Sequence, residues 1–287
     1  MTPLRARMIR ELELQRKSPN TIKPYLLAVE DLAKHYGRSP DLLSIEEIRD
    51  YVHHLIAVRK LASSTVNQRI CGIRFLFQQV LGQRDFRLFA PMKRSGYLPE
   101  PLARTEIQAL LGATRNQKHR VMLMTAYGGG LRVSELVNLK PVDIHSQRMM
   151  IRVNRGKGKK DRYTLLSQRL LQELRAYWAS YRPDSYLFEG ATAGQHIAVG
   201  TAQGIFDQAK ARAGVKHGRG IHSLRHSFGT HLMEAGVPIP TIQLLMGHSQ
   251  IRTTMRYLHV TRKFLGTLRS PLDILREPME QDYREWS

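Results

Sequence analysis

The chain has 287 residues, of which 42% are hydrophobic, so it is long enough for two domains with buried cores. Lysine and arginine outnumber aspartate and glutamate by 45 to 24, giving a net charge of +21 and a pI of about 10.5. This excess runs along the whole chain and favours nucleic acid as the partner, whereas the lack of a long apolar run argues against a membrane. The N-terminal residues lack the apolar core of a signal peptide. The single cysteine excludes an intramolecular disulfide framework and suits the cytoplasm.

The spacing of apolar residues predicts that residues 1 to about 84 are almost entirely helical. The first helix is indicated by apolar residues recurring on one side, Leu4, Met8, Ile9 and Leu12. A second helix starts at Ser18, as its cap, and Pro19, and ends at Gly37. Pro24 inside this segment either bends the helix or marks its true start.

Two further helices complete this half of the chain. Ser44 and Glu47 form the pattern of a capping box for the third helix. Ser63 or Ser64 begins the fourth, whose inward face is formed by Val66, Ile70, Ile73, Phe77 and Val80. Such a bundle is either a scaffold with solvated basic faces or a DNA-binding module whose helices lie against phosphates.

Residues 85–102 are rich in proline and basic residues and lack periodicity, which indicates a linker between two domains. Thr105 is expected to cap a short helix, and a second apolar helix ends in three consecutive glycines at 128–130. Arg132 and Glu135 follow at once. Taken alone, Arg132 is typical of a helix surface, but glycines before it allow close backbone packing that directs it inward.

Residues 149–166 have the pattern of a β-hairpin, with two β-rich segments around a turn of glycines and lysines. Lys157, Lys159 and Lys160 lie in this turn, which could simply be a solvated basic loop that contacts DNA without specificity. The sequence GKGKK lacks the spacing of a P-loop. Helices are predicted next at about 167–181 and 201–213.

Residues 221–260 carry the densest group of reactive side chains. His222 and Arg225 are spaced to share one face of a helix. Apolar residues at helical spacing bury the other faces, and Pro240 fits the first turn of the following helix. Short helices of this kind can direct His222, Arg225, His248 and Tyr257 toward one point.

These side chains suit attack on a phosphodiester. Arginine offers a planar set of donors to phosphate oxygens, and histidine exchanges a proton near neutral pH. Tyrosine can act as the oxygen nucleophile but needs activation, because its unperturbed pKa is about 10. Together they allow a covalent phosphotyrosine intermediate.

Simpler interpretations exist for each residue. His222 and His226 have a spacing that can also hold zinc, but no glutamate follows as in HExxH, and Cys71 is the only cysteine. His248 could cap a helix or lie in the core, and Tyr257 could be a half-buried structural tyrosine.

The sequence in residues 221–260 closely resembles the active-site region of tyrosine recombinases, the phage-integrase and Xer-type enzymes. The segment GGLRVSELVNLKPVDI resembles the first arginine box of that family, and the helical segments before residue 84 resemble its SAM-like core-binding domain. The resemblance implies six catalytic positions in order: Arg132, Lys157, His222, Arg225, His248 and Tyr257. It places Glu135 at a supporting acidic position and leaves Lys159 and Lys160 as rivals of Lys157.

The resemblance also implies the architecture and the activity. The fold is expected to be mainly α with a small β-sheet or hairpin, in an α+β arrangement. The expected divisions are a core-binding domain at 1–84, the linker at 85–102, a catalytic domain at 103–270 and an acidic tail at 271–287. The tail is either disordered or packs on a neighbouring subunit. The expected partners are double-stranded DNA and further copies of the chain, a dimer on each site and a tetramer in the synapse.

The expected reaction is cutting and rejoining of DNA through a 3′-phosphotyrosine, with no metal, cofactor or ATP. The sequence shows no paired carboxylates or cysteine and histidine cluster suited to a catalytic metal. The alternatives are a related transposase of a mobile element, a topoisomerase or nuclease, and a non-catalytic DNA-binding regulator. The filled catalytic positions argue against the regulator.

Overall fold

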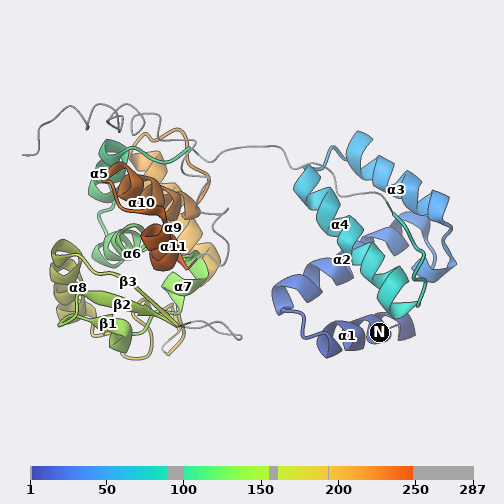
Figure 1. Cartoon of the computed structure of the whole chain (residues 1–287), viewed down its shortest axis with the longest axis horizontal. Coiled ribbons are helices and arrows are strands. Elements are labelled where there is room, and N and C mark those ends of the chain that lie inside the picture. The colour runs from blue at the N-terminus through green and yellow to red at the C-terminus, as the bar shows by residue number, and fades with distance from the viewer. Residues whose placement is uncertain (1, 89–99, 155–160, 193, 248–287) are drawn as a thin grey trace, which may run out of the picture. The chain divides into compact units, whose positions relative to one another are not determined.

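The computed structural model describes residues 2–88, 100–154, 161–192 and 194–247. These residues form two compact units, one within residues 1–97 and the other from residue 98 onward (Figure 1). In the described part, helices dominate and the strands form one small antiparallel sheet, which confirms the predicted fold class. No helix there is both long enough and apolar enough to cross a membrane.

The first unit is helical, as predicted. Its elements are α1 (Pro3–Leu14), α2 (Pro19–Tyr36), the 3-10 turn η1 (Pro40–Leu42), α3 (Ile45–Ala57), α4 (Ser63–Phe75) and the π-helical turn η2 (Leu76–Val80). The capping box is present, because Ser44 Oγ accepts the Glu47 amide and the Glu47 carboxylate accepts the Ser44 amide. Pro24 lies inside α2, so the alternative start of this helix at Pro24 is wrong.

Helices α2 and α4 pack against each other (Figure 1), and their backbones approach closely at Gly72. A Cβ atom on Gly72 would lie 2.9 Å from the Cβ of Ala28 and 3.0 Å from the carbonyl oxygen of Tyr25. Only glycine allows this approach. Around the crossing, the core of the unit contains Leu32, Ile48, Leu55, Ile70 and Phe77.

The second unit begins with α5 (Arg104–Gly112), α6 (Gln117–Gly128), α7 (Val133–Val137) and the 3-10 turn η3 (Pro141–Asp143). The prediction that Thr105 caps α5 was wrong. The helix begins at Arg104, and its N-cap residue is Ala103. The Glu106 carboxylate accepts the backbone N–H of Ala103 at 2.8 Å and so stabilises this start.

A three-stranded antiparallel sheet follows, with β1 (Ile144–His145), β2 (Met150–Val153) and β3 (Arg162–Leu165) in this order. The predicted hairpin is therefore present as β2 and β3, and β1 extends it. Val153 pairs with Arg162 and Ile151 with Thr164. Paired residues share a face, so Arg162 and Thr164 lie on the buried face beside Ile151 and Val153.

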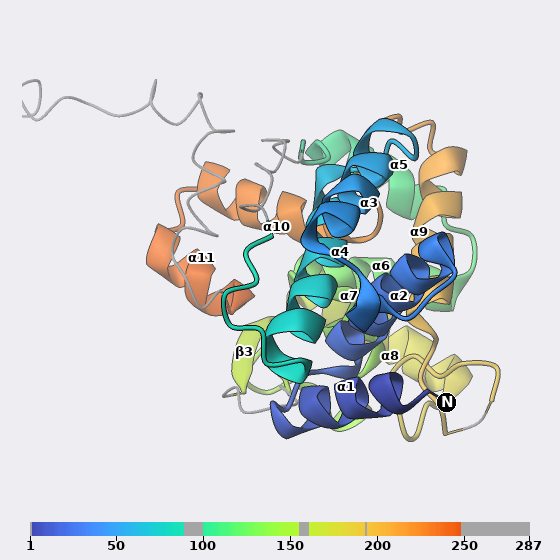
Figure 2. The same ribbon diagram turned by 90° about the vertical axis from the view of Figure 1, so that its right-hand side faces the viewer.

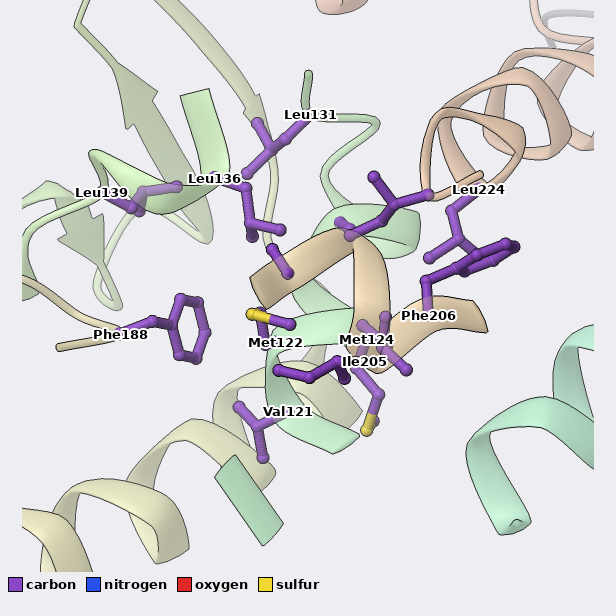
Figure 3. Packing of buried hydrophobic residues seen from close by; sticks show 14 of the residues in the cluster. Val121, Met122, Met124, Leu131, Leu136, Leu139, Phe188, Ile205, Phe206 and Leu224 are labelled. Carbon is purple, nitrogen blue, oxygen red and sulfur yellow. The ribbon is translucent and has the colours of Figure 1, made fainter. Parts of the chain in front are cut away.

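The remaining helices are α8 (Gln168–Tyr181), α9 (Val199–Arg212), α10 (His222–Glu234) and α11 (Ile239–Met246). Helix α9 begins two residues before its predicted start. Helix α10 packs on α6, and α11 contacts both α10 and β3 (Figure 2). The core that holds these elements includes the residues labelled in Figure 3: Val121, Met122, Met124, Leu131, Leu136, Leu139, Phe188, Ile205, Phe206 and Leu224.

Candidate functional site

Arg225 is the most deeply buried large side chain of the site, with 1% of its surface exposed. It lies in the first turn of α10, whose apolar residues Leu224 and Phe228 anchor the helix in the surrounding cores. Its guanidinium donates to the carbonyl oxygens of Gly130 at 2.7 Å and Met246 at 2.5 Å. Arg225 therefore joins the glycine turn after α6 to the end of α11.

Arg132 lies at the start of α7 and is more accessible, with 36% of its side chain exposed. Its backbone N–H donates to Glu135 Oε2 at 2.9 Å, and its guanidinium donates to Glu135 Oε1 at 2.8 Å. A second donor of the guanidinium reaches the carbonyl oxygen of Gly247 at 3.4 Å. The backbone of Arg132 is thus fixed, while its side chain remains partly accessible to solvent.

Glu135 joins the arginines of the site. Its carboxylate contacts Arg132, accepts two hydrogen bonds from Arg162 at 2.8 and 2.9 Å, and lies 3.5 Å from Arg225 Nη1. Burial alone would raise the pKa of Glu135, but the hydrogen bonds and charge of Arg162, then Arg132 and Arg225, lower it to about 2. The carboxylate is therefore ionised at neutral pH. Three guanidinium groups around one carboxylate leave an excess of positive charge.

Arg162 is a member of this cluster that the sequence analysis did not identify. It lies at the start of β3 with only 6% of its side chain exposed. Besides Glu135, it bonds through Nε to the carbonyl oxygen of Leu245 at 2.8 Å. The sequence signal for it was a charged residue at the first position of a strand. This signal does not identify Arg162 as buried unless the register of β3 against β2 is known, because that register places the residue on the buried face.

His222 is the first residue of α10 and lies on the same helix as Arg225, as the spacing of the two residues predicted. Partial desolvation, followed by the positive charges of Arg225 and Arg132, lowers the pKa of His222, against a smaller opposing effect of Glu135. His222 is exposed to solvent, so the loss of solvation is incomplete. A histidine with a lowered pKa is mostly neutral at pH 7 and can accept a proton. Its ring lies edge-on to that of His226, with centroids 4.7 Å apart.

Three predicted catalytic residues, Lys157, His248 and Tyr257, lie outside the described residues, as do Lys159 and Lys160 and the acidic tail at 271–287. Described residues beside two of these segments, 155–160 and the segment that begins at His248, contact the arginines and Glu135 of the site. Gly247, which precedes His248 in the chain, contacts Arg132, and Arg162 follows the segment 155–160 by two positions. The structure thus brings together Arg132, Glu135, His222 and Arg225.

Comparison with known families gives a match over both units. The model of the "Phage integrase family" matches residues 100–263, and that of the "Phage integrase, N-terminal SAM-like domain" matches residues 4–85. The chain belongs to the phage integrase family of tyrosine recombinases. It is a site-specific recombinase, an enzyme that cleaves and religates DNA, as the resemblance implied.

Individual relatives of this recombinase cover nearly its full length. It is 42% identical over 286 residues to "Putative integrase/recombinase y4qK" of Sinorhizobium fredii, which covers 97% of this chain and 91% of that one. Tyrosine recombinase XerA of Thermococcus kodakarensis is 33% identical over 273 residues, covering 93% and 94%. A lambda integrase dimer bound to a COC′ core site has the same fold, with a TM-score of 0.69, 17% identity, and 86% and 96% coverage.

Proposed function

We propose that Arg132 and Arg225 hold the scissile phosphate of a DNA recombination site while Tyr257 attacks the phosphorus. The attack forms a bond between the tyrosine oxygen and phosphorus and breaks the bond to the 5′ oxygen, giving a 3′-phosphotyrosine and a free 5′-hydroxyl. A 5′-hydroxyl from a second strand then reverses the step. Because the covalent intermediate retains the phosphodiester energy, the cycle needs no ATP. Because Arg132 and Arg225 supply the charge stabilisation, it also needs no metal.

The observation that carries this proposal is the carboxylate that Arg132 and Arg225 share. Glu135 Oε1 lies 2.8 Å from Arg132 and Oε2 lies 3.5 Å from Arg225, so both guanidinium groups are fixed around one point. Fixed positive charge of this kind stabilises the extra negative charge of a phosphorane-like transition state. Arg132 is already accessible. Arg225 is almost fully buried, so its contact with phosphate requires a local displacement of the residues that cover it.

The remaining roles concern protons. His222, with its lowered pKa, accepts the tyrosine proton or orients the phosphate. Lys157 protonates the leaving 5′ oxygen, and His248 donates a hydrogen bond to a phosphate oxygen. Glu135 supports the arginines and takes no part in the chemistry.

The assembly follows from the domains. The core-binding domain is formed by residues 1–84 and the catalytic domain by residues 103–270. The linker at 85–102 joins them, and both domains bind DNA. A dimer occupies each site and a tetramer forms the synapse. The similarity to a lambda integrase dimer on its core site supports the dimer. The tail at 271–287 is acidic. The composition favours action on cytoplasmic DNA.

The test uses a duplex that the protein itself selects from a random-sequence pool, prepared as a series with a nick at each central position. Cleavage next to a nick releases a short fragment and traps the covalent adduct. Arg132→Ala and Arg225→Ala are expected to bind this duplex yet form adduct at least about 100-fold more slowly. A wild-type protein that binds but forms no adduct would instead support the non-catalytic regulator. Adduct formation at wild-type rates by both variants would contradict the assigned roles.

A further inference from the structure

Arg162 is the one arginine of the cluster without a role in the reaction proposed above. Its side chain is almost inaccessible, and its described hydrogen bonds lead to Glu135 and to the carbonyl of Leu245. All three guanidinium nitrogens of Arg162, Nε, Nη1 and Nη2, are engaged in these hydrogen bonds, so the group is committed to contacts within the protein. We propose that Arg162 is a positioning residue, which fixes Glu135 and through it the orientation of Arg132 and Arg225. The proposal rests on the roles proposed for those two arginines.

The geometry of the pair is the first argument. Nη1 and Nη2 of Arg162 bond to Oε1 and Oε2 of Glu135, a two-point contact that defines the plane of the carboxylate as well as its location. Nε of the same group bonds to Leu245. Arg162 therefore ties strand β3 to α7 and to α11, the element whose last carbonyl holds Arg225.

The sharing of oxygens is the second argument. Oε1 of Glu135 accepts from Arg162 and also from Arg132, while Oε2 accepts from Arg162 and lies 3.5 Å from Arg225. Rotation of the carboxylate would therefore move both arginines. Oε2 also accepts the backbone N–H of Arg132 at 2.9 Å, which holds the carboxylate at the start of α7. Each oxygen contacts both Arg162 and one arginine of the reaction, so a change in the orientation that Arg162 supports reaches the phosphate site in one step.

Charge gives the third argument. Without Arg162, the negative charge of Glu135 would be balanced only by Arg132 and Arg225, and the carboxylate would compete with the phosphate for them. With Arg162 present, its charge offsets that of Glu135. Arg132 and Arg225 then keep their positive charge for the substrate.

The experiment measures adduct formation in a single turnover at saturating selected duplex, together with the Kd for that duplex. Arg162→Met is expected to slow adduct formation about 10- to 100-fold, because small misplacements of catalytic groups have effects of this size. The Kd should change less than about threefold, because the guanidinium of Arg162 is bonded to Glu135 and Leu245 and not to DNA. The matched control is Arg120→Met, which removes another Arg–Glu ion pair, to Glu173 between α6 and α8. It should keep the wild-type rate.

A second comparison separates positioning from mere stability. If Arg162 acts through Glu135, then Arg162→Met should have almost no further effect on the rate of adduct formation in the Glu135→Gln background. The double variant is also less prone to unfold, because both substituted side chains are uncharged and neither leaves the other as an unpaired buried charge. All rates are compared below the melting temperature of the least stable variant. Two results would overturn the proposal. One is a folded Arg162→Met variant that forms adduct at the wild-type rate, and the other is an equal fall in that rate in the wild-type and Glu135→Gln backgrounds. Wild-type rates in Arg132→Ala and Arg225→Ala would instead contradict the roles of those arginines.

Discussion

Gly130 and Phe228 touch so closely that no side chain fits between them. A Cβ atom on residue 130 would lie 2.3 Å from the ring, and the residue has a φ of +58°, in the left-handed region that glycine adopts readily. The carbonyl of the same residue accepts a hydrogen bond from Arg225. The glycine turn after α6 therefore sets both the packing of α10 and the place of its arginine.

Gly130→Ala should therefore destabilise the protein and slow cleavage. The conformational strain and the overlap with Phe228 together are expected to lower the free energy of unfolding by roughly 1–3 kcal/mol. Displacement of the Gly130 carbonyl should also lower the rate of adduct formation. Urea denaturation and the nicked-duplex assay measure the two effects.

Gly204→Ala is the control for this prediction. Gly204 lies inside α9, its φ is not positive, and nothing lies within 4 Å of an added Cβ. This substitution should stabilise the protein by about 0.4–1 kcal/mol and leave the rate unchanged. Equal destabilisation by both variants would show that the contact with Phe228 is unimportant.

Glu135 makes stability depend on pH in acid. Its pKa is lowered from 4.5 to about 2 in the folded protein, so the unfolded chain binds its proton first. The stabilisation is present above pH 4.5 and is lost as the pH falls toward 2, an effect of about 3 kcal/mol. Glu135→Gln removes this titration. The difference in unfolding free energy between wild type and Glu135→Gln should therefore shrink from pH 6 to pH 3, and a constant difference would contradict the ion-pair cluster.

Much of the fold follows from local sequence signals. The capping box at Ser44 and Glu47 and the glycine that ends α2 act within a few residues, so the pattern alone predicts them. His222 and Arg225 lie on a helix for the same reason. The family motifs added the order of the catalytic positions, which no spacing argument establishes.

Arg162 shows where local reasoning fails. In the strand Arg162–Leu165, the alternation of polar and apolar residues favours Tyr163 and Leu165 as the buried pair. The structure exposes these two and buries Arg162 and Thr164 instead. The register opposite Val153 and Ile151 decides the face, and Glu135, 27 residues away in the chain, makes the buried charge tolerable. Neither fact can be read from residues 149–166.

Lys157→Ala should be the most damaging change among the hairpin lysines. All three lysines add charge for binding, but only the general acid helps to expel the 5′ oxygen, a contribution typically of about 10²–10⁴-fold. A duplex with a bridging 5′ sulfur has a better leaving group, so it should rescue Lys157→Ala while Arg132→Ala stays slow. Lys159→Ala and Lys160→Ala are the matched controls. Rescue of either in place of Lys157→Ala would move the general acid to that lysine.

Cleavage should continue in excess EDTA. The proposed chemistry assigns charge stabilisation to Arg132 and Arg225 and proton transfer to side chains, so no step requires a divalent cation. Adduct yield with and without chelator measures this directly. Loss of cleavage in EDTA that magnesium or manganese restores would indicate a metal-dependent nuclease instead.

The formation of a covalent bond between Tyr257 and DNA tests the central claim most directly. Wild type, Tyr257→Phe and Tyr283→Phe are incubated with the nicked selected duplex and separated on a denaturing gel. Wild type and Tyr283→Phe should give equal amounts of adduct, and Tyr257→Phe should bind the duplex with unchanged Kd but give none. Adduct that persists in Tyr257→Phe and disappears in Tyr283→Phe would contradict the account and make the tail tyrosine the nucleophile.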